Sequence, residues 1–352
     1  MNNFAIQSGV IQASNDGYYE FYRSYITDNY AYMLSISEIF IVTRPPLFSN
    51  STIFGNLVLT RNQILNELDS CDLLCFLSDI YTQYLKNNLN LLNGGSIEAS
   101  IQCISGALTI ANNTYVTDQP VFINSYLSEV IISYLHIYSI TSESRVMSLV
   151  ESHLILNNSD VTNINSTSSG DFISLSFQSV ATINNVIYSN STTKFMVALL
   201  SSVQIASLDF DRVVMNNYIL SFVDCINVSM RDINQITNTR GSMILFSGSF
   251  IDSINNLTIS GSNDTGLYIV RSNVFMMDKI QINNAHQSIR IEKSHIDIFQ
   301  NSQLSFSGSE QIVKGGAIYV ENSNMTMTNI TFDSNTAQIG GAVSISCDVY
   351  DS

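Results

Sequence analysis

Tryptophan, proline and basic residues are scarce in this chain of 352 residues, which has no Trp, three Pro and only 14 Lys and Arg against 29 Asp and Glu. Three prolines exclude collagen and polyproline architectures, which need proline throughout. A net charge of -15 argues against a basic patch for nucleic-acid phosphates, so we expect no nucleic-acid partner. No apolar run reaches about 18 residues, so we expect no membrane span within this chain.

The chain is nevertheless predicted to fold. Hydrophobic residues make up 45% of it and charged residues 12%, the reverse of a disordered acidic tail. Serine, threonine and asparagine are frequent and favour turns, because their side chains compete for backbone hydrogen bonds. Isoleucine, valine, phenylalanine and tyrosine favour half-buried pleated strands. The mixture predicts many short strands joined by tight turns.

A short phrase, serine followed by alternating apolar residues (Ser-x-Φ-x-Φ), recurs along the chain with a mean period near 24 residues. A second apolar phrase follows most copies, and a third apolar patch precedes them. Each period therefore holds about three short strands and no helical stretch. The copies begin at Ser105, Ser128, Ser152, Gln178, Ser201, Asp224, Gly248, Ser272, Ser294 and Ser323, with serine replaced in three of them.

Alternation with a period of two residues places one face of every strand in a core. The sequence therefore predicts an all-β fold, a right-handed parallel β-helix of about ten or more turns with about 24 residues per turn. Each strand would pair with its copies one turn away, about 4.8 Å distant. A leucine-rich repeat has a similar period and is the alternative. Its consensus phrase fits residues 327–335 but not the other copies.

The most specific motif lies between residues 315 and 343, where two Gly-Gly-Ala-apolar segments flank a Phe-x-x-Asn segment. It resembles the repeats of chlamydial polymorphic outer membrane proteins, and residues 94–97 hold a degenerate copy. The resemblance implies a right-handed, pectin-lyase-like β-helix in an exported, surface-exposed and often adhesive protein. The motif residues are Gly315, Gly316, Ala317, Phe332, Asn335, Gly340, Gly341 and Ala342.

These motif residues have structural roles in our interpretation. Paired glycines let the chain turn through positive φ and approach the neighbouring turn closely. Phe332 is expected to fill the interior. Asn335 is expected at a bend, in the left-handed conformation and with a local hydrogen bond. Repeated Asn-Asn pairs, such as those at 157/158 and 184/185, are interpreted in the same way.

The first hundred residues differ from the rest. Residues 1–95 are expected to form irregular turns with a short helical insertion or cap near residues 61–90, where leucines, Cys71 and Cys75 fall at helical spacings. Such a cap would cover the unpaired end of the rod. Residues 96–352 would form the β-helix. The missing signal segment and an end in mid-turn suggest a fragment, truncated at the C-terminus, of a longer membrane-anchored protein.

Candidate chemistry is sparse. Five Cys make no even disulfide framework, the four His do not cluster, and we expect no metal and no cofactor. The weak catalytic candidates are Asp209, Asp211 and Asp232, on neighbouring turns beside two arginines, Arg212 and Arg231. Carboxylates about 5–9 Å apart could hydrolyse a glycoside, and the same oxygens could hold Ca²⁺. The alternative is a solvated face with local ion pairs.

Asparagine sequons (Asn-x-Ser/Thr) are numerous but no more so than chance predicts for this composition. They would allow glycosylation in an exported eukaryotic protein. The candidate positions are Asn50, Asn112, Asn157, Asn165, Asn190, Asn227, Asn256, Asn263, Asn324 and Asn329.

We therefore predict a non-enzymatic β-helix, extracellular or at the cell surface, that serves as a stalk, an adhesin or a fragment of a receptor ectodomain. Its ligand would be an unidentified surface protein or glycan. One alternative is a glycan-binding β-helix, which a groove lined by exposed Tyr or Phe would favour. The other is a polysaccharide lyase or hydrolase, which stacked acidic and basic side chains beside a groove would favour.

Overall fold

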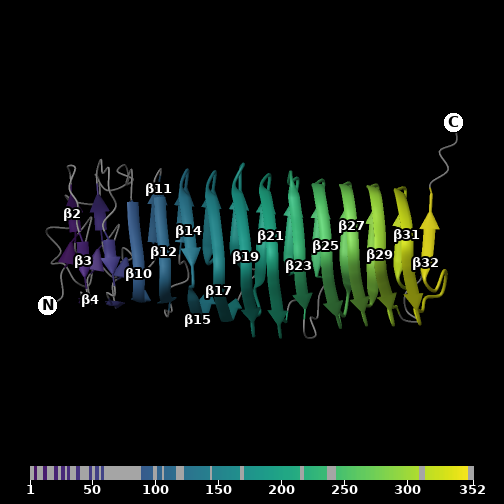
Figure 1. Ribbon diagram of the computed structural model, residues 1–352, viewed down its shortest axis with the longest axis horizontal. Coiled ribbons are helices and arrows are strands. Elements are labelled where there is room, and N and C mark those ends of the chain that lie inside the picture. Colours follow the sequence, from purple (N-terminus) through teal and green to yellow (C-terminus); the bar gives the residue numbers. More distant parts are fainter. Residues whose placement is uncertain are drawn as a thin grey trace, which may run out of the picture.

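A computed structural model describes residues 123–142, 145–166, 170–214, 218–235, 243–308 and 314–347, and before residue 123 the strands given below. The strands stack one behind another along the long axis of a rod, with the earliest strands at one end and the latest at the other (Figure 1). Neighbouring strands run parallel. The described residues contain no helix.

The larger sheet has sixteen strands and extends along the rod from β3 to β31, and we call it the long sheet. Its strands are β3 (Glu20–Tyr22), β4 (Tyr25–Thr27), β7 (Leu47–Ser49), β8 (Thr52–Phe54), β10 (Leu89–Ile97), β12 (Ala107–Tyr115), β14 (Glu129–Ser133), β15 (His136–Ser142), β17 (His153–Ser166), β19 (Val180–Ser189), β21 (Ser202–Asp211), β23 (Val228–Gln235), β25 (Phe250–Ser260), β27 (Asn273–Asn283), β29 (His295–Ser305) and β31 (Asn324–Asp333).

The short sheet has eleven strands, one from each turn that contributes to it. They are β11 (Ile101–Ile104), β13 (Ile123–Tyr126), β16 (Met147–Val150), β18 (Asp171–Ser176), β20 (Lys194–Leu199), β22 (Leu220–Val223), β24 (Ile244–Ser247), β26 (Thr265–Val270), β28 (Gln287–Glu292), β30 (Ile318–Glu321) and β32 (Val343–Ser346). Two small sheets complete the strands, one of β1 (Phe4–Ala5), β5 (Tyr30–Ala31) and β9 (Leu57–Val58), the other of β2 (Ile11–Ala13) and β6 (Ser37–Ile39).

The strand registers confirm the predicted repeat. Between Met147 of β16 and Val343 of β32, the short sheet takes eight successive steps, each of 22 to 29 residues. The fold is thus a parallel β-helix of about eight turns, about 24 residues each, with further strands before them. The predicted ten or more turns was approximate. Each turn gives a strand to a second sheet where a leucine-rich repeat would have a helix or 3₁₀ segment, which argues against the leucine-rich alternative.

The turn at residues 123–142 has the predicted three strands, β13, β14 and β15. From β17 onward a turn has two, because the long-sheet strand continues through a bend. At the bend one residue per turn has positive φ, and the strand pairs with its neighbours on both sides of it. A single left-handed residue turns the chain without ending the ladder. The bend row, as we call it, consists of Tyr134, Asn158, Asn185, Ser207, Asp232, Asn256, Lys279, Asn301 and Asn329.

A row of buried hydroxyls forms the corner between the two sheets. Each serine there donates to the carbonyl two or three residues earlier, and most accept the backbone N–H of the equivalent residue one turn before. Ser249, for example, accepts from Cys225 N at 3.1 Å. This serine corner consists of Ser128, Ser152, Ser179, Ser201, Cys225, Ser249, Ser272, Ser294 and Ser323.

Three copies of the predicted serine phrase therefore begin one residue too early. Ser179, Cys225 and Ser249 occupy the corner, whereas Gln178, Asp224 and Gly248 precede it with positive φ. The same left-handed position before a corner serine is taken by Leu200 and Arg271, among others. The serine and the residue before it thus make one two-residue turn.

The interior is a continuous apolar column, as the alternation predicted. One part of it is aromatic. Tyr188 is fully buried there, and its ring centroid lies 5.7 Å from that of Phe172, 5.2 Å from that of Phe195 and 6.1 Å from that of Phe210. The Tyr188 hydroxyl donates to the Thr193 carbonyl at 3.2 Å, which satisfies the buried phenol. Burial raises the pKa of Tyr188, so this hydroxyl stays protonated.

The glycine pairs behave as predicted, but Asn335 does not. Gly315 and Gly340 have φ of 61° and 62°, and a Cβ on either would lie 2.2 Å from a backbone oxygen. Ser334, not Asn335, has the positive φ, 53°. The Asn335 side chain instead bonds to the preceding turn, donating to Leu304 O at 2.8 Å, so it links turns rather than bonding locally.

The helical segment predicted near residues 61–90, with Cys71 and Cys75, lies almost entirely outside the described residues, which exclude 59–88. Its last two residues belong to β10, which begins at Leu89. Ser105 also lies outside the described residues. The division at residue 95 stays a prediction. A helix long and apolar enough to cross a membrane does not occur in the part of the chain that the structure describes.

Candidate functional site

An open hollow of about 330 Å³ lies on the outer face of the long sheet, just before the bend row. Five successive strands, β17 to β25, contribute side chains in two rows. The first row consists of Ile155, Thr182, Gln204, Ser229 and Ser253. The second row consists of Asn157, Asn184, Ala206 and Arg231.

Most polar side chains of the hollow are free. Asn184, Gln204 and Arg231 are exposed, and with Asn157 they make no side-chain hydrogen bond or ion pair to any residue that the structure describes. Ser229 has only a long contact, 3.5 Å from its hydroxyl to Asp252. Amides and a guanidinium offer donors and acceptors to a ligand. The hollow is therefore a recess whose amides and guanidinium are not used in bonds to the described residues.

The bend row beside it is the opposite case. Asn185 Nδ2 donates to Asn158 Oδ1 at 2.8 Å, and Asn256 Nδ2 donates to Asp232 Oδ1 at 2.6 Å. Further along the rod, Asn329 donates to Asn301 at 2.8 Å. These bonds join one turn to the next. Adjacent residues of one strand therefore belong to two different rows, one that links the turns and one that faces the hollow.

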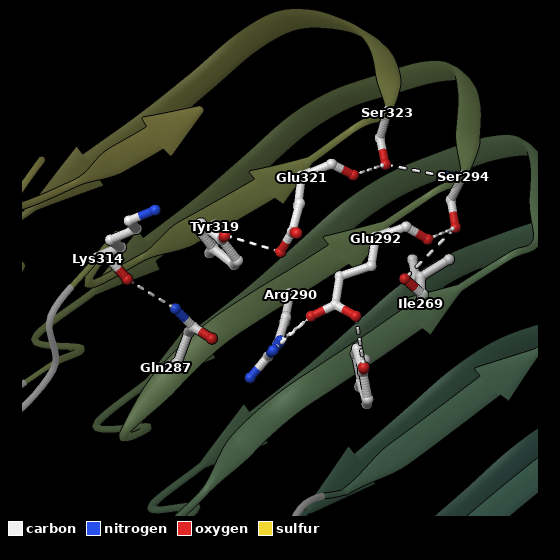
Figure 2. Close-up of polar contacts among 10 residues, drawn as sticks. Ile269, Gln287, Arg290, Glu292, Ser294, Lys314, Tyr319, Glu321 and Ser323 are labelled. Carbon is white, nitrogen blue, oxygen red and sulfur yellow. Dashed lines mark hydrogen bonds and ion pairs between the residues drawn. The ribbon is translucent and has the colours of Figure 1, made fainter. Parts of the chain in front are cut away.

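A second outward cluster lies on β26, β28 and β30 of the short sheet (Figure 2). The guanidinium of Arg290 lies 5.3 Å from the ring centroid of Tyr268 and 5.7 Å from that of Tyr319. Arg290 also pairs with Glu292. The Tyr268 hydroxyl donates to Glu292, and the Tyr319 hydroxyl to Glu321, both at 2.8 Å. The polar groups of the cluster thus bond to one another, and their contacts link three neighbouring turns.

The two phenols and the guanidinium of this cluster keep their protons near neutral pH. Burial and the hydrogen bond to Glu292 raise the pKa of Tyr268 to about 12. Burial and Glu321 likewise raise the pKa of Tyr319. Burial opposes the charge of Arg290, but Glu292 outweighs it and raises the pKa of the guanidinium. Neither phenol is therefore poised to exchange a proton near neutral pH, as a general acid or base would be.

The predicted carboxylates each have a separate partner. Asp209 on β21 accepts from Asn234 Nδ2 at 3.0 Å, and Asp211 pairs with the adjacent Arg212 at 3.2 Å. Asp232 lies in the bend row, in register with Ser207 rather than with Asp209. Local bonding of this kind fits the solvated face that we gave as the alternative to catalysis.

The histidines are dispersed as predicted. His153 and His295 occupy one outward row six turns apart, and each faces a carboxylate of its own, Glu129 and Asp297. Cys225 is buried in the serine corner and Cys347 is exposed, both as free thiols. Within the described ranges, no three His, Cys, Asp or Glu side chains are placed to share a metal ion.

One buried carboxylate lies apart from the hollow. Asp171, 8% exposed at the start of β18, faces Lys194 of β20 across 4.0 Å. Its Oδ1 has no hydrogen-bond partner among the described residues. Burial raises the pKa of Asp171, although Lys194 and Arg145 act in the other direction.

Sequence reasoning missed the hollow. The Asn-Asn pairs at 157/158 and 184/185 carried the signal, because their second members belong to the bend row and their first members to the hollow. Both members were interpreted as turn residues. The tyrosine cluster was also visible in principle, since Tyr268 and Tyr319 interrupt otherwise apolar patches at outward positions.

Comparisons with known proteins give distant likenesses. No protein-family profile matches the chain, and no curated protein is detectably similar to it. Among solved structures, it is similar to PfbA, a surface adhesin of Streptococcus pneumoniae, with 11% identity and a TM-score of 0.38, covering 96% of this chain and 85% of that one. It is also similar to the receptor-binding domain of the siphovirus 9NA tailspike, with 10% identity, a TM-score of 0.26 and coverage of 97% and 74%.

Proposed function

We propose that this chain is a non-enzymatic binding rod, an extracellular or surface β-helix that serves as a stalk, an adhesin or part of a receptor ectodomain. The chemistry of the hollow carries this proposal. Its lining residues offer hydroxyls, amides and one guanidinium, but no carboxyl, imidazole, thiol or phenol. Such a surface can bind a ligand by hydrogen bonds, yet none of these lining groups can act as a general acid or base near neutral pH.

The build of the rod supports the same role. Bonded rows at the serine corner and along the bend fix each turn to the next, and a buried apolar column runs inside. A stiff rod presents a site at a fixed distance from any point of attachment. Location outside the cell agrees with the exposure of most described sequon asparagines, Asn227 and Asn324 among them.

The test measures binding and turnover on the same protein. The full chain is assayed for saturable retention on arrays of glycans and of surface proteins, and for shortening of polysaccharide substrates. We expect retention with unchanged substrate length. Depolymerisation that disappears in Asp209→Asn or Asp232→Asn would contradict the proposal, and so would the absence of any retained ligand.

A further inference from the structure

The hollow carries one charge, and that charge is unpaired. Arg231 is the only ionisable residue in its lining. It lies in the second row, between Ala206 of β21 and Asn255 of β25, and it forms no ion pair with the residues that the structure describes. In a chain with net charge -15, a solvent-facing guanidinium without a carboxylate partner is a local centre of opposite sign.

We propose that the hollow binds an oligosaccharide that bears a single carboxylate, and this inference rests on the proposed function. Arg231 receives the carboxylate, for which the planar fork of a guanidinium gives two parallel hydrogen bonds. Asn184 and Gln204 bind sugar hydroxyls. A hydroxyl both donates and accepts, and a carboxamide offers a donor and an acceptor side by side.

The charge balance selects one carboxylate over many. Exposed charges act over about 8–10 Å at physiological ionic strength. A polyanion that extends past the hollow therefore meets the acidic remainder of the chain, including Asp160 and Asp209 on the same sheet. A ligand with one carboxylate and otherwise neutral hydroxyls gains the contact with Arg231 and meets less repulsion, chiefly from Asp232 and Asp252 beside the hollow.

One strand of the recess also carries an exposed aromatic residue. Phe250 lies at the start of β25, the last strand that lines the hollow, and its side chain is 55% exposed. Sugar rings have apolar C–H faces as well as hydroxyls, and an exposed aromatic ring can cover such a face. Phe250 is outside the lining itself, three residues before Ser253 on the same strand, where it can take the apolar side of a ligand that extends past the hollow.

The test uses a matched pair of ligands, 3′-sialyllactose and lactose, which differ by one carboxylate-bearing sugar. Calorimetry or NMR titration of the full chain should show binding of sialyllactose and at least about tenfold weaker binding of lactose, the size expected for a charge-assisted bond. Arg231→Gln should remove the preference. Arg212→Gln makes the same charge change one residue after the end of β21, outside the hollow's lining, and should keep the preference within about twofold. Unchanged thermal midpoints establish that both variants fold.

Several outcomes overturn the inference, and three of them concern the sugar titrations. They are equal binding of the two sugars, loss of the preference in Arg212→Gln, and tighter binding of heparin than of sialyllactose. If the array assay retains a protein ligand while neither sugar binds, the saccharide inference fails and the binding rod stands. If the wild-type chain retains nothing in any assay, the proposed function fails as well.

Discussion

Asn185 and Asn184 are neighbours in one strand, yet they belong to different regions of the molecule. Asn185, in the bend row, has φ of 53° and bonds to Asn158 on the adjacent turn. Asn184, in the hollow, is in extended conformation and has no partner among the described residues. Residue type does not distinguish them, but hydrogen bonding does. Polar rows that bond to one another are structural, and the polar row that is left free over the recess is the one that we propose as the binding site.

The serine corner gives the largest test of this distinction. Replacing Ser249 with alanine leaves the buried N–H of Cys225 without its 3.1 Å acceptor. We expect a loss of about 2 to 3 kcal/mol in the free energy of unfolding, because an unsatisfied buried donor keeps its full desolvation cost. Ser253→Ala, in the free first row, should cost less than about 0.5 kcal/mol. Urea unfolding of both variants measures the two losses in free energy. Equal losses would refute the distinction between bonded and free polar rows.

The asparagine neighbours give the next largest effect. Asn185→Val should destabilise the rod by about 2 kcal/mol, because a β-branched residue resists positive φ and the bond to Asn158 is lost. Asn184→Val should leave stability unchanged, since valine suits an exposed extended position. Thermal unfolding of the two variants measures the difference. A larger loss in Asn184→Val would reverse the assignment of the two rows.

Asp171 shows what a missing bond costs inside the rod. Its folded pKa is raised above the ordinary 3.8, so the stability from the protonated carboxyl is present below pH 3.8 and is lost as the pH rises through the folded value. Asp171→Asn should therefore be more stable than wild type at pH 7, by about 1 kcal/mol. The gain should vanish in acid. Asp209→Asn, the exposed control, should show neither effect, and a gain that persists in acid would contradict this account.

The tyrosine cluster gives the smallest effect. Because the folded pKa of Tyr268 is about 12, its contribution to stability is present below pH 10 and is lost as the pH rises towards 12. Glu292→Gln should lower that pKa towards the ordinary 10. An ultraviolet titration measures it for this one phenol when the curve of the same chain with Tyr268→Phe is subtracted. An unchanged titration curve in Glu292→Gln would show that the bond to Glu292 is not made in solution.

The sequence was sufficient to predict the parallel β-helix but not to predict the hollow. Alternating apolar residues and a steady period are local features, and they determined the parallel turns. The shift at Gln178, Asp224 and Gly248 was missed because the left-handed residue before each corner leaves no mark in residue type. The hollow depends on five aligned turns and on which amides remain unbonded. Neither property can be obtained from single phrases such as Asn184-Asn185.

The most direct test of the account is hydrogen–deuterium exchange of the full chain with and without saturating 3′-sialyllactose. We predict slower exchange in peptides from the first halves of β17, β19, β21 and β23, which line the hollow. Exchange in β26, β28 and β30, which carry the self-satisfied tyrosine cluster, should not change. Protection on those strands, or protection nowhere on the rod, would contradict the claim that the free polar row is the binding site.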